Sequence, residues 1–156
     1  MQEISLIPYS ADLYSSRLEK WLTNEELMHG WGIPPFKKDE IYPWTEDPTR
    51  VILMVKDEKN GNIVGFVNFY KWNREKGIAS RGTLIDPEYQ NQGYGKASIE
   101  ASNKYAFENM GLKKIELYVE ADNERSRHVT EKLGYTFSHF DPTKQRYYYY
   151  MEKNRI

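Results

Sequence analysis

The sequence predicts an α/β domain in which a mixed, mostly antiparallel sheet is flanked by helices. Strand-like and helical segments interleave along the chain, and no repeat or low-complexity tract interrupts them. The chain has 156 residues, 39% of them hydrophobic and 15% aromatic, which is enough apolar material for one core. We therefore expect a single domain over residues 1–156, with the element order β-α-α-β-β-β-α-β-α-β-β.

Each element has its own local signal. The runs with strand character are 3–9, 50–57, 62–70, 78–86, 113–120, 135–140 and 146–152. The runs with helical spacing of apolar residues, or the composition of a short helix, are 12–22, 24–30, 97–110 and 123–133. Asn60-Gly61 suits a hairpin turn that needs positive φ, and Gly111 and Gly134 each stop a helix. The prolines and aromatic residues of Trp31–Pro48 predict a long loop that covers part of the molecule.

Composition excludes several classes of function. With 22 basic and 23 acidic residues and a net charge of −1, the chain lacks the broad basic surface that a nucleic acid requires. There is no cysteine, so disulfides and thiolate chemistry are excluded, and His29, His128 and His139 lack metal-ligand spacing. The start lacks a signal-peptide pattern, and no apolar run approaches the roughly 20 residues that span a bilayer. We expect a cytoplasmic protein with no metal and no membrane or nucleic-acid partner.

A glycine-rich loop, QNQGYGK at residues 90–96, separates a predicted strand from a long predicted helix. Unpaired amides and the positive end of a helix dipole attract anions at such a position. The spacing does not fit a P-loop, because Gln90 stands where a glycine is needed and Ala97 where Ser or Thr would hold magnesium. A dinucleotide-binding loop would need a glycine at Ser98. From the loop alone, a plain tight turn into a helix remains the alternative to an anion site.

The surrounding sequence carries a resemblance to a known family. The segment LIDPEYQNQGYGKA contains Gln90-x-x-Gly93-x-Gly95, and a helix, a strand and ADNERSRHVTEKLGYTF follow it. This pattern resembles the GNAT superfamily of acetyl-CoA-dependent N-acetyltransferases, and within it the branch of the ribosomal-protein alanine N-acetyltransferases. The resemblance covers Ile78 to about Phe140 and is loose over residues 20–48. It implies a GNAT-like fold, acetyl-CoA as co-substrate, and direct attack of a primary amine on the acetyl group.

The resemblance also implies the residues that bind coenzyme A. The strand before the loop is expected to lie along the pantetheine arm, and the loop amides are expected to bond the pyrophosphate. The expected contacts are Thr83, Leu84, Ile85, Gln90, Asn91, Gln92, Gly93, Tyr94, Gly95, Lys96, Asn123 and Ser126. Asn123 and Ser126 are also the candidate catalytic residues, because an amide and a hydroxyl there can bond the sulfur. For Asn123, capping of the last helix is a competing role.

Two positions depart from the family pattern. Thr130 stands where many relatives carry a tyrosine that protonates the thiolate, and Ser80 stands where relatives carry a glutamate that acts as base. The general base is therefore unassigned, and a non-catalytic acyl-CoA-binding regulatory module is the alternative to an enzyme. A nucleotide-binding domain that uses the same loop is a third, weaker alternative.

The acceptor is expected to be a primary amine of a small molecule or a protein N-terminus. Acidic residues that suit a cationic amine are Glu25, Glu26, Asp39, Glu40, Glu46 and Asp47. Trp31 and Trp44 can wall a pocket or pin the loop to the core. Tyr147–Tyr150 alternate across the last strand, so two are expected to face the core. If that strand lies exposed at an edge of the sheet, it can pair with a second subunit, so a homodimer is possible.

Overall fold

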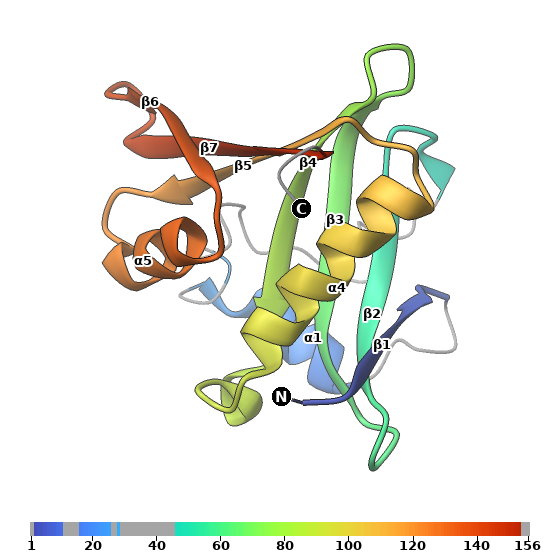
Figure 1. Ribbon diagram of the computed structural model, residues 1–156. Helices are drawn as coiled ribbons and strands as arrows, with labels where there is room; N and C mark the ends of the chain where they lie inside the picture. Colours follow the sequence, from blue (N-terminus) through green and yellow to red (C-terminus); the bar gives the residue numbers. More distant parts are fainter. Residues whose placement is uncertain (1, 11–15, 26–27, 29–45, 154–156) are drawn as a thin grey trace.

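The computed structural model describes residues 2–10, 16–25, 28 and 46–153, and a seven-stranded mixed sheet lies at its centre (Figure 1). The elements are β1 (Ile4–Pro8), α1 (Ser16–Thr23), β2 (Val51–Asp57), β3 (Ile63–Asn73), β4 (Ile78–Ile85), the 3₁₀ turn η2 (Pro87–Tyr89), α4 (Tyr94–Glu108), β5 (Lys114–Glu120), α5 (Glu124–Lys132), β6 (Thr136–Asp141) and β7 (Arg146–Glu152). The strand order across the sheet is β1-β2-β3-β4-β5-β7-β6.

One neighbouring pair of strands differs from the rest. β4 and β5 run parallel, while the other neighbours run antiparallel. A parallel pair needs a crossover connection, and here α4 supplies it between the two strands. The sheet is therefore mixed and mostly antiparallel, as the sequence predicts.

Two apolar clusters hold the helices to opposite faces of the sheet. On one face, α4 contributes Ala106 and Phe107 to a cluster with inward residues of β2 to β5 and β7. On the other face, α1 contributes Trp21 and Leu22 to a smaller cluster with residues of β2, β3 and β4. Figure 1 shows α4 crossing in front of the strands and α1 behind them. Both faces of the central strands are thus covered, which explains the nearly continuous apolar runs in β2 and β3.

Most predicted elements are present with small shifts at their ends. β3 continues to Asn73, three residues beyond the predicted strand, and the long helix begins at Tyr94 rather than at residue 97. Gly111 and Gly134 have φ of 70° and 95°, as expected for glycines that end helices. The second predicted helix, 24–30, and the loop that follows it lie largely outside the described residues. Trp31, Trp44, Glu26, Asp39, Glu40 and His29 belong to that part of the chain.

The last strand corrects one expectation. β7 lies between β5 and β6 and pairs with both, so it is not an exposed edge strand. The reason is that β6 and β7 form a hairpin whose second strand pairs with β5. Tyr149 is 1% exposed in the core and Tyr148 lies on the opposite face, so the predicted alternation of the tyrosines is confirmed. The homodimer stays a prediction, but β7 cannot be the pairing edge.

Candidate functional site

The sheet opens where β4 and β5 part. Their pairing covers three positions, Ile78 to Ser80 on β4, and no further pairing between them occurs in the described residues. On its other side, β4 stays paired with β3 as far as Ile85. Beyond Ser80, β4 therefore pairs with β3 along one edge, and its other edge has no strand partner among the described residues.

The main chain of β4 presents alternate residues to this side. The carbonyl of Gly77 accepts hydrogen bonds of 2.7 and 3.1 Å from the start of β5, whereas the N–H of Asp86 donates to a β3 carbonyl at 2.8 Å. Because N–H and C=O groups alternate in direction along a strand, the odd-numbered residues point away from β3. We call the main chain of Arg81, Thr83 and Ile85 the open edge. An extended ligand can pair with such an edge as an added strand would.

The glycine loop follows directly at the end of this strand. Asp86 caps η2 by accepting from the N–H of Glu88 at 2.9 Å. The side chain of Gln90 donates to the carbonyl of Ile85 at 3.1 Å, and that of Gln92 donates to the carbonyl of Glu88 at 3.0 Å. The amides of both glutamines therefore hold the loop in shape. This leaves the main chain of the loop, rather than these side-chain amides, to contact a ligand.

The first turn of α4 offers donors to an anion. Gly93 is the N-cap with φ of 92°, and it has no side chain with which to cap the helix. The first helical bond runs from Ala97 to the carbonyl of Gly93, so Tyr94, Gly95 and Lys96 have N–H groups without an intrahelical acceptor. A Cβ on Gly95 would meet no atom closer than 4.0 Å, so packing within the protein does not require glycine there. A ligand approaching the helix start would require it.

Tyr94 anchors the start of α4 from the opposite side. Its buried hydroxyl donates to the carboxylate of Asp57 at the end of β2. That hydrogen bond raises the pKa of Tyr94 to about 12 and, with the N–H of Lys59, lowers the pKa of Asp57. The side chain of Tyr94 is thus structural, and only its main-chain N–H faces the ligand position.

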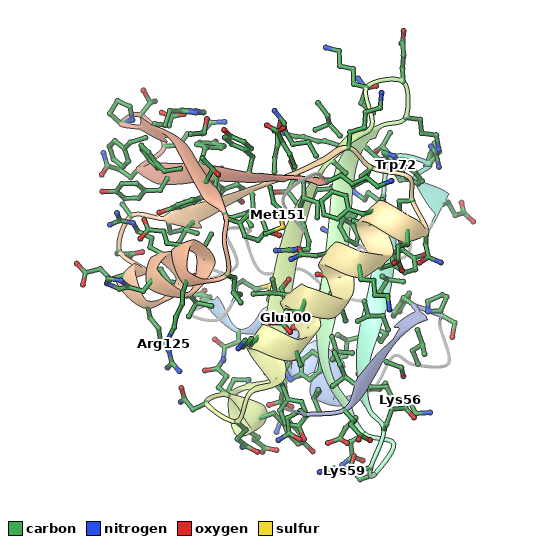
Figure 2. The ribbon with its side chains drawn as sticks, in the orientation of Figure 1. Lys56, Lys59, Trp72, Glu100, Arg125 and Met151 are labelled. Carbon is green, nitrogen blue, oxygen red and sulfur yellow. The ribbon has the colours of Figure 1, made fainter. Side chains whose placement is uncertain are left out.

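The predicted residues of the last helix lie at the start of α5. Asn123 caps the helix, because its Oδ1 accepts from the N–H of Ser126 at 3.2 Å. The capping role considered for Asn123 is therefore present, and contact of Asn123 and Ser126 with a cofactor stays a prediction. Figure 2 shows Arg125, an exposed residue of this first turn, extending toward the end of the molecule at which α4 begins. Arg125 was not among the residues predicted from the sequence, although it lies between the predicted contacts Asn123 and Ser126.

Three buried polar side chains meet at the point where the strands part. Arg81, 5% exposed, donates to Oδ1 of Asn103 on α4 at 2.5 Å and lies 5.3 Å from the ring centre of Tyr135. Tyr135 follows α5 and donates to the same Oδ1 at 2.5 Å. We call Arg81, Asn103 and Tyr135 the vertex cluster. Sequence reasoning missed it, because its members come from three separate elements.

The opposite face of the sheet carries tyrosines at the same level. Tyr70 of β3 bonds Tyr118 of β5, and the ring centres of Tyr118 and Tyr148 of β7 are 5.9 Å apart. We call Tyr70, Tyr118 and Tyr148 the tyrosine face. Burial raises the pKa of Tyr70 and of Tyr118, so both stay protonated at neutral pH. Ser80 of β4 is the cross-strand partner of Tyr70.

An ion pair completes this face. Arg146 Nε lies 2.9 Å from the carboxylate of Glu120, and its guanidinium lies 4.0 Å from the ring centre of Tyr118. His139 of β6 stacks on Tyr148 with ring centres 4.6 Å apart. Arg146 and Glu120 on this face therefore have partners within the protein.

The described acidic candidates give no clear base. Asp47 accepts from the N–H and the hydroxyl of Thr49 at 2.8 and 2.7 Å and lies 3.5 Å from Arg50. The hydrogen bonds from Thr49 lower the pKa of Asp47, so it is a poor proton acceptor. Glu25 and Glu46 are exposed. Within the part of the chain that the structure describes, no cluster of His, Asp or Glu could hold a metal, and no helix is long and apolar enough to cross a membrane.

These features fit one class of ligand. The open edge suits an extended chain with amide groups, and the amides at the start of α4 suit a pyrophosphate at the end of that chain. Two residues of the open edge also carry buried side-chain atoms without hydrogen-bond partners, Nε of Arg81 and Oγ1 of Thr83. Fold and site together have the features of an acyl-coenzyme A-binding site.

Comparison with known proteins gives the family. Residues 13–135 match the model of the acetyltransferase (GNAT) family, and the chain belongs to that family. It is 30% identical over 109 residues to spermidine N(1)-acetyltransferase of Escherichia coli K12, covering 60% of this chain and 59% of that protein. It is 34% identical over 88 residues to mycothiol acetyltransferase of Propionibacterium freudenreichii, covering 54% of this chain and 27% of that protein. The chain thus spans less than two thirds of the length of these curated relatives.

Solved structures agree on the fold. The crystal structure of spermidine N-acetyltransferase from Vibrio cholerae in complex with CoA and spermine superposes with a TM-score of 0.84 at 20% identity. The match covers 97% of this chain and 96% of that chain. The predicted GNAT fold and family are confirmed. The narrower resemblance to the alanine N-acetyltransferase branch stays a prediction.

Proposed function

We propose that the protein is an acetyl-CoA-dependent N-acetyltransferase that acts on a primary amine of a small molecule. The observation that carries the proposal is the open edge of β4 with the glycine loop at its end. Family membership and acetyltransferase relatives support an enzyme over the alternative, a non-catalytic acyl-CoA-binding module. A protein N-terminus as acceptor, a cytoplasmic location and a homodimer stay predictions.

In this proposal, the pyrophosphate of acetyl-CoA binds the amides of Gly93–Lys96, and the pantetheine arm lies along the open edge. Lys96 of α4 and Arg125 of α5 are exposed cations that attract the phosphate groups. The missing Cβ of Gly95 lets the ligand approach the helix start. Asn123 and Ser126 contact the cofactor from α5.

The chemistry requires an amine placed against the acetyl carbon and a polarised carbonyl. An N–H of the open edge donates to the acetyl oxygen and stabilises the negative charge that develops there. The amine approaches from the tyrosine face near Ser80, because α4 packs against the other face of β4 at Arg81 and α1 packs on the tyrosine side further along β4, at Leu84. Its nitrogen bonds the acetyl carbon, the carbon–sulfur bond breaks with its electron pair going to sulfur, and the amine loses a proton to water. Positioning supplies much of the acceleration in such a direct transfer.

The first acceptors to try are spermidine and spermine. The curated relative is a spermidine N(1)-acetyltransferase, and the solved structure contains spermine. Among small-molecule amines, a polyamine is therefore the best-supported acceptor. Tyr118 and Tyr148 are aromatic residues that can bind an alkylammonium chain by a cation–π contact, beside Arg146 and His139, which already contact one side of their rings. Other primary amines serve as the alternatives in the same assay.

The test is release of free coenzyme A by the purified full chain, with the acetylated product identified by mass spectrometry. The panel holds spermidine, spermine, amino sugars, aminoglycosides, amino acids and peptides with free N-termini. We expect one class of amine to give equal amounts of coenzyme A and acetylated product. Acetyl-CoA binding without transfer to any amine would favour the non-catalytic module, and no binding at all would overturn the proposal.

The variant Gly95→Ala tests coenzyme A binding without an expected loss of stability. Alanine is about 1 kcal/mol better than glycine in a helix, and the site has room for its Cβ, so stability should stay equal or rise. Affinity for coenzyme A should fall about tenfold, because the methyl group occupies the approach to the amides. An unchanged affinity in a calorimetric titration would remove the pyrophosphate from this position.

A further inference from the structure

The vertex cluster contains a buried positive charge whose protein neighbours are neutral. Arg81 donates to the amide oxygen of Asn103 and lies against the phenol of Tyr135. Burial raises the pKa of Tyr135, so it carries no negative charge. Among the described residues, no carboxylate forms an ion pair with Arg81, and its Nε has no hydrogen-bond partner. Burying a cation in this way costs free energy that a counter-charge would offset.

The position of Arg81 along β4 places this charge beside the open edge. Arg81 is the first residue beyond Ser80, the last β4 residue paired with β5, so it stands at the inner end of the open edge. Two residues further on, Thr83 carries a second buried atom without a partner, Oγ1. The main-chain N–H of Tyr135 donates to the carbonyl of Thr130 at 3.2 Å, which ties the cluster to the last turn of α5. Unsatisfied polar atoms thus gather where an extended ligand on β4 would end.

We propose that Arg81 is a catalytic residue that stabilises the thiolate released from acetyl-CoA. This inference rests on the proposed function. When the amine nitrogen bonds the acetyl carbon, the carbon–sulfur bond breaks and its electron pair stays on sulfur, which then takes a proton from water. The guanidinium keeps its own protons and supplies a nearby positive charge with a free N–H donor.

Two neighbouring groups, Thr130 and Tyr135, do not suit this role. Thr130 is 6% exposed and carries only a neutral hydroxyl. The hydroxyl of Tyr135 is already donated to Asn103. Arg81 is therefore the one described member of the vertex cluster that combines a charge with an unused donor.

The first test compares the affinity of coenzyme A with that of desulfo-coenzyme A, which lacks the thiol, by calorimetry across pH. A cysteine-type thiol has a pKa of about 8.5, and a nearby cation lowers it in the complex. A lowered bound pKa means that coenzyme A binds more tightly as pH rises toward the free pKa, and then levels off. Between about pH 7 and pH 9, we expect its affinity relative to desulfo-coenzyme A to rise about tenfold.

Two variants assign this rise to Arg81. Arg81→Met removes the charge, so the rise should disappear and turnover should fall on the order of 100-fold. Asn103→Asp keeps Arg81 but places a carboxylate against it, at the atom that already accepts its hydrogen bond. Stability of Asn103→Asp should stay equal or increase, because the buried cation gains a partner, while the rise with pH should shrink.

The outcomes are distinct. A flat ratio in the natural protein, or a rise that survives in Arg81→Met, overturns the inference even if acetyl transfer is established. Should Arg81→Met fail to fold, Asn103→Asp decides, and an unchanged rise there also overturns the inference. If the natural protein binds no coenzyme A, it is the proposed function that fails.

Discussion

Where β4 and β5 part, each face of the sheet carries an arginine, and the two arginines differ in their protein partners. On the tyrosine face, Arg146 pairs with Glu120 at 2.9 Å and covers the ring of Tyr118. On the α4 side, Arg81 is more deeply buried, has neutral neighbours and keeps one N–H without a partner. A charge satisfied within the protein contributes to the fold, whereas a buried charge left unsatisfied is available to a ligand. We therefore expect substitutions on the α4 side to change binding and turnover, and substitutions of the ion pair on the tyrosine face to change stability.

The largest effect is expected on the α4 side, at the glycine loop. Gly93→Asp places a carboxylate beside the amides that receive the pyrophosphate, and like charges at this distance should weaken coenzyme A binding on the order of 10- to 100-fold. The matched control is Gly61→Asp, because Gly61 also has positive φ and a Cβ there would meet nothing within 4 Å. Calorimetric titration should show a loss for position 93 alone. Equal losses in both variants would mean that backbone strain, not charge, weakens binding.

The next effect tests the satisfied arginine. Glu120→Gln leaves Arg146 without its counter-charge, and we expect about 1–2 kcal/mol lower unfolding free energy for this partly buried pair. Arg81→Met should instead leave stability within about 1 kcal/mol or raise it, because it removes an unpaired buried charge. Urea unfolding of both variants measures the difference. A larger loss in Arg81→Met than in Glu120→Gln would break the comparison and make Arg81 a structural residue.

A smaller effect is expected on the tyrosine face, where we propose that the amine enters. Tyr118→Phe removes the hydroxyl that bonds Tyr70 and leaves the ring beneath Arg146. If amines enter over the tyrosine face, KM for the amine should rise roughly threefold to tenfold, the range for one lost hydrogen bond of about 1 kcal/mol. Affinity for coenzyme A should not change. A matching loss of coenzyme A affinity would show that the two sides do not act separately.

The smallest effect concerns a third buried charge, Asp57, which is satisfied by Tyr94. Its pKa is lowered in the folded state, so it contributes stability above its unfolded pKa and loses that contribution as pH falls through the folded pKa. Asp57→Asn should therefore show a flatter decline of Tm than the natural protein below about pH 4. Thermal unfolding from neutral to acidic pH measures it. Tyr94→Phe should reduce the same acid dependence, and identical slopes in all three proteins would contradict the assignment.

Local patterns predict much of the fold. The strands 50–57 and 113–120 and the ends of two helices at Gly111 and Gly134 follow from short-range periodicity and glycine, and the structure has them within a few residues. The glycine loop and its resemblance to the GNAT family also follow from a short contiguous motif. Signals of this kind come from residues that are near each other in the chain.

Other features depend on contacts between distant segments. The inner position of β7 is set by pairing with β5, and the separation of β4 from β5 is a property of two strands joined by a crossover. Arg81 meets a helix residue 22 positions away, which no periodicity indicates. The tyrosine face likewise combines β3, β5 and β7. The cofactor contacts predicted from the sequence come from contiguous motifs and stay predictions, whereas the vertex cluster and the tyrosine face combine residues from separate elements that no local pattern connects.

We propose that coenzyme A binds along the open edge of β4 and at the start of α4. Amide hydrogen exchange of the full chain with and without coenzyme A tests it most directly, because those N–H groups gain acceptors only in the complex. We expect added protection at Thr83, Ile85 and Tyr94–Lys96, with the β1–β2 ladder unchanged. Protection at other segments, or saturating binding that leaves these amides as exposed as before, would contradict the account.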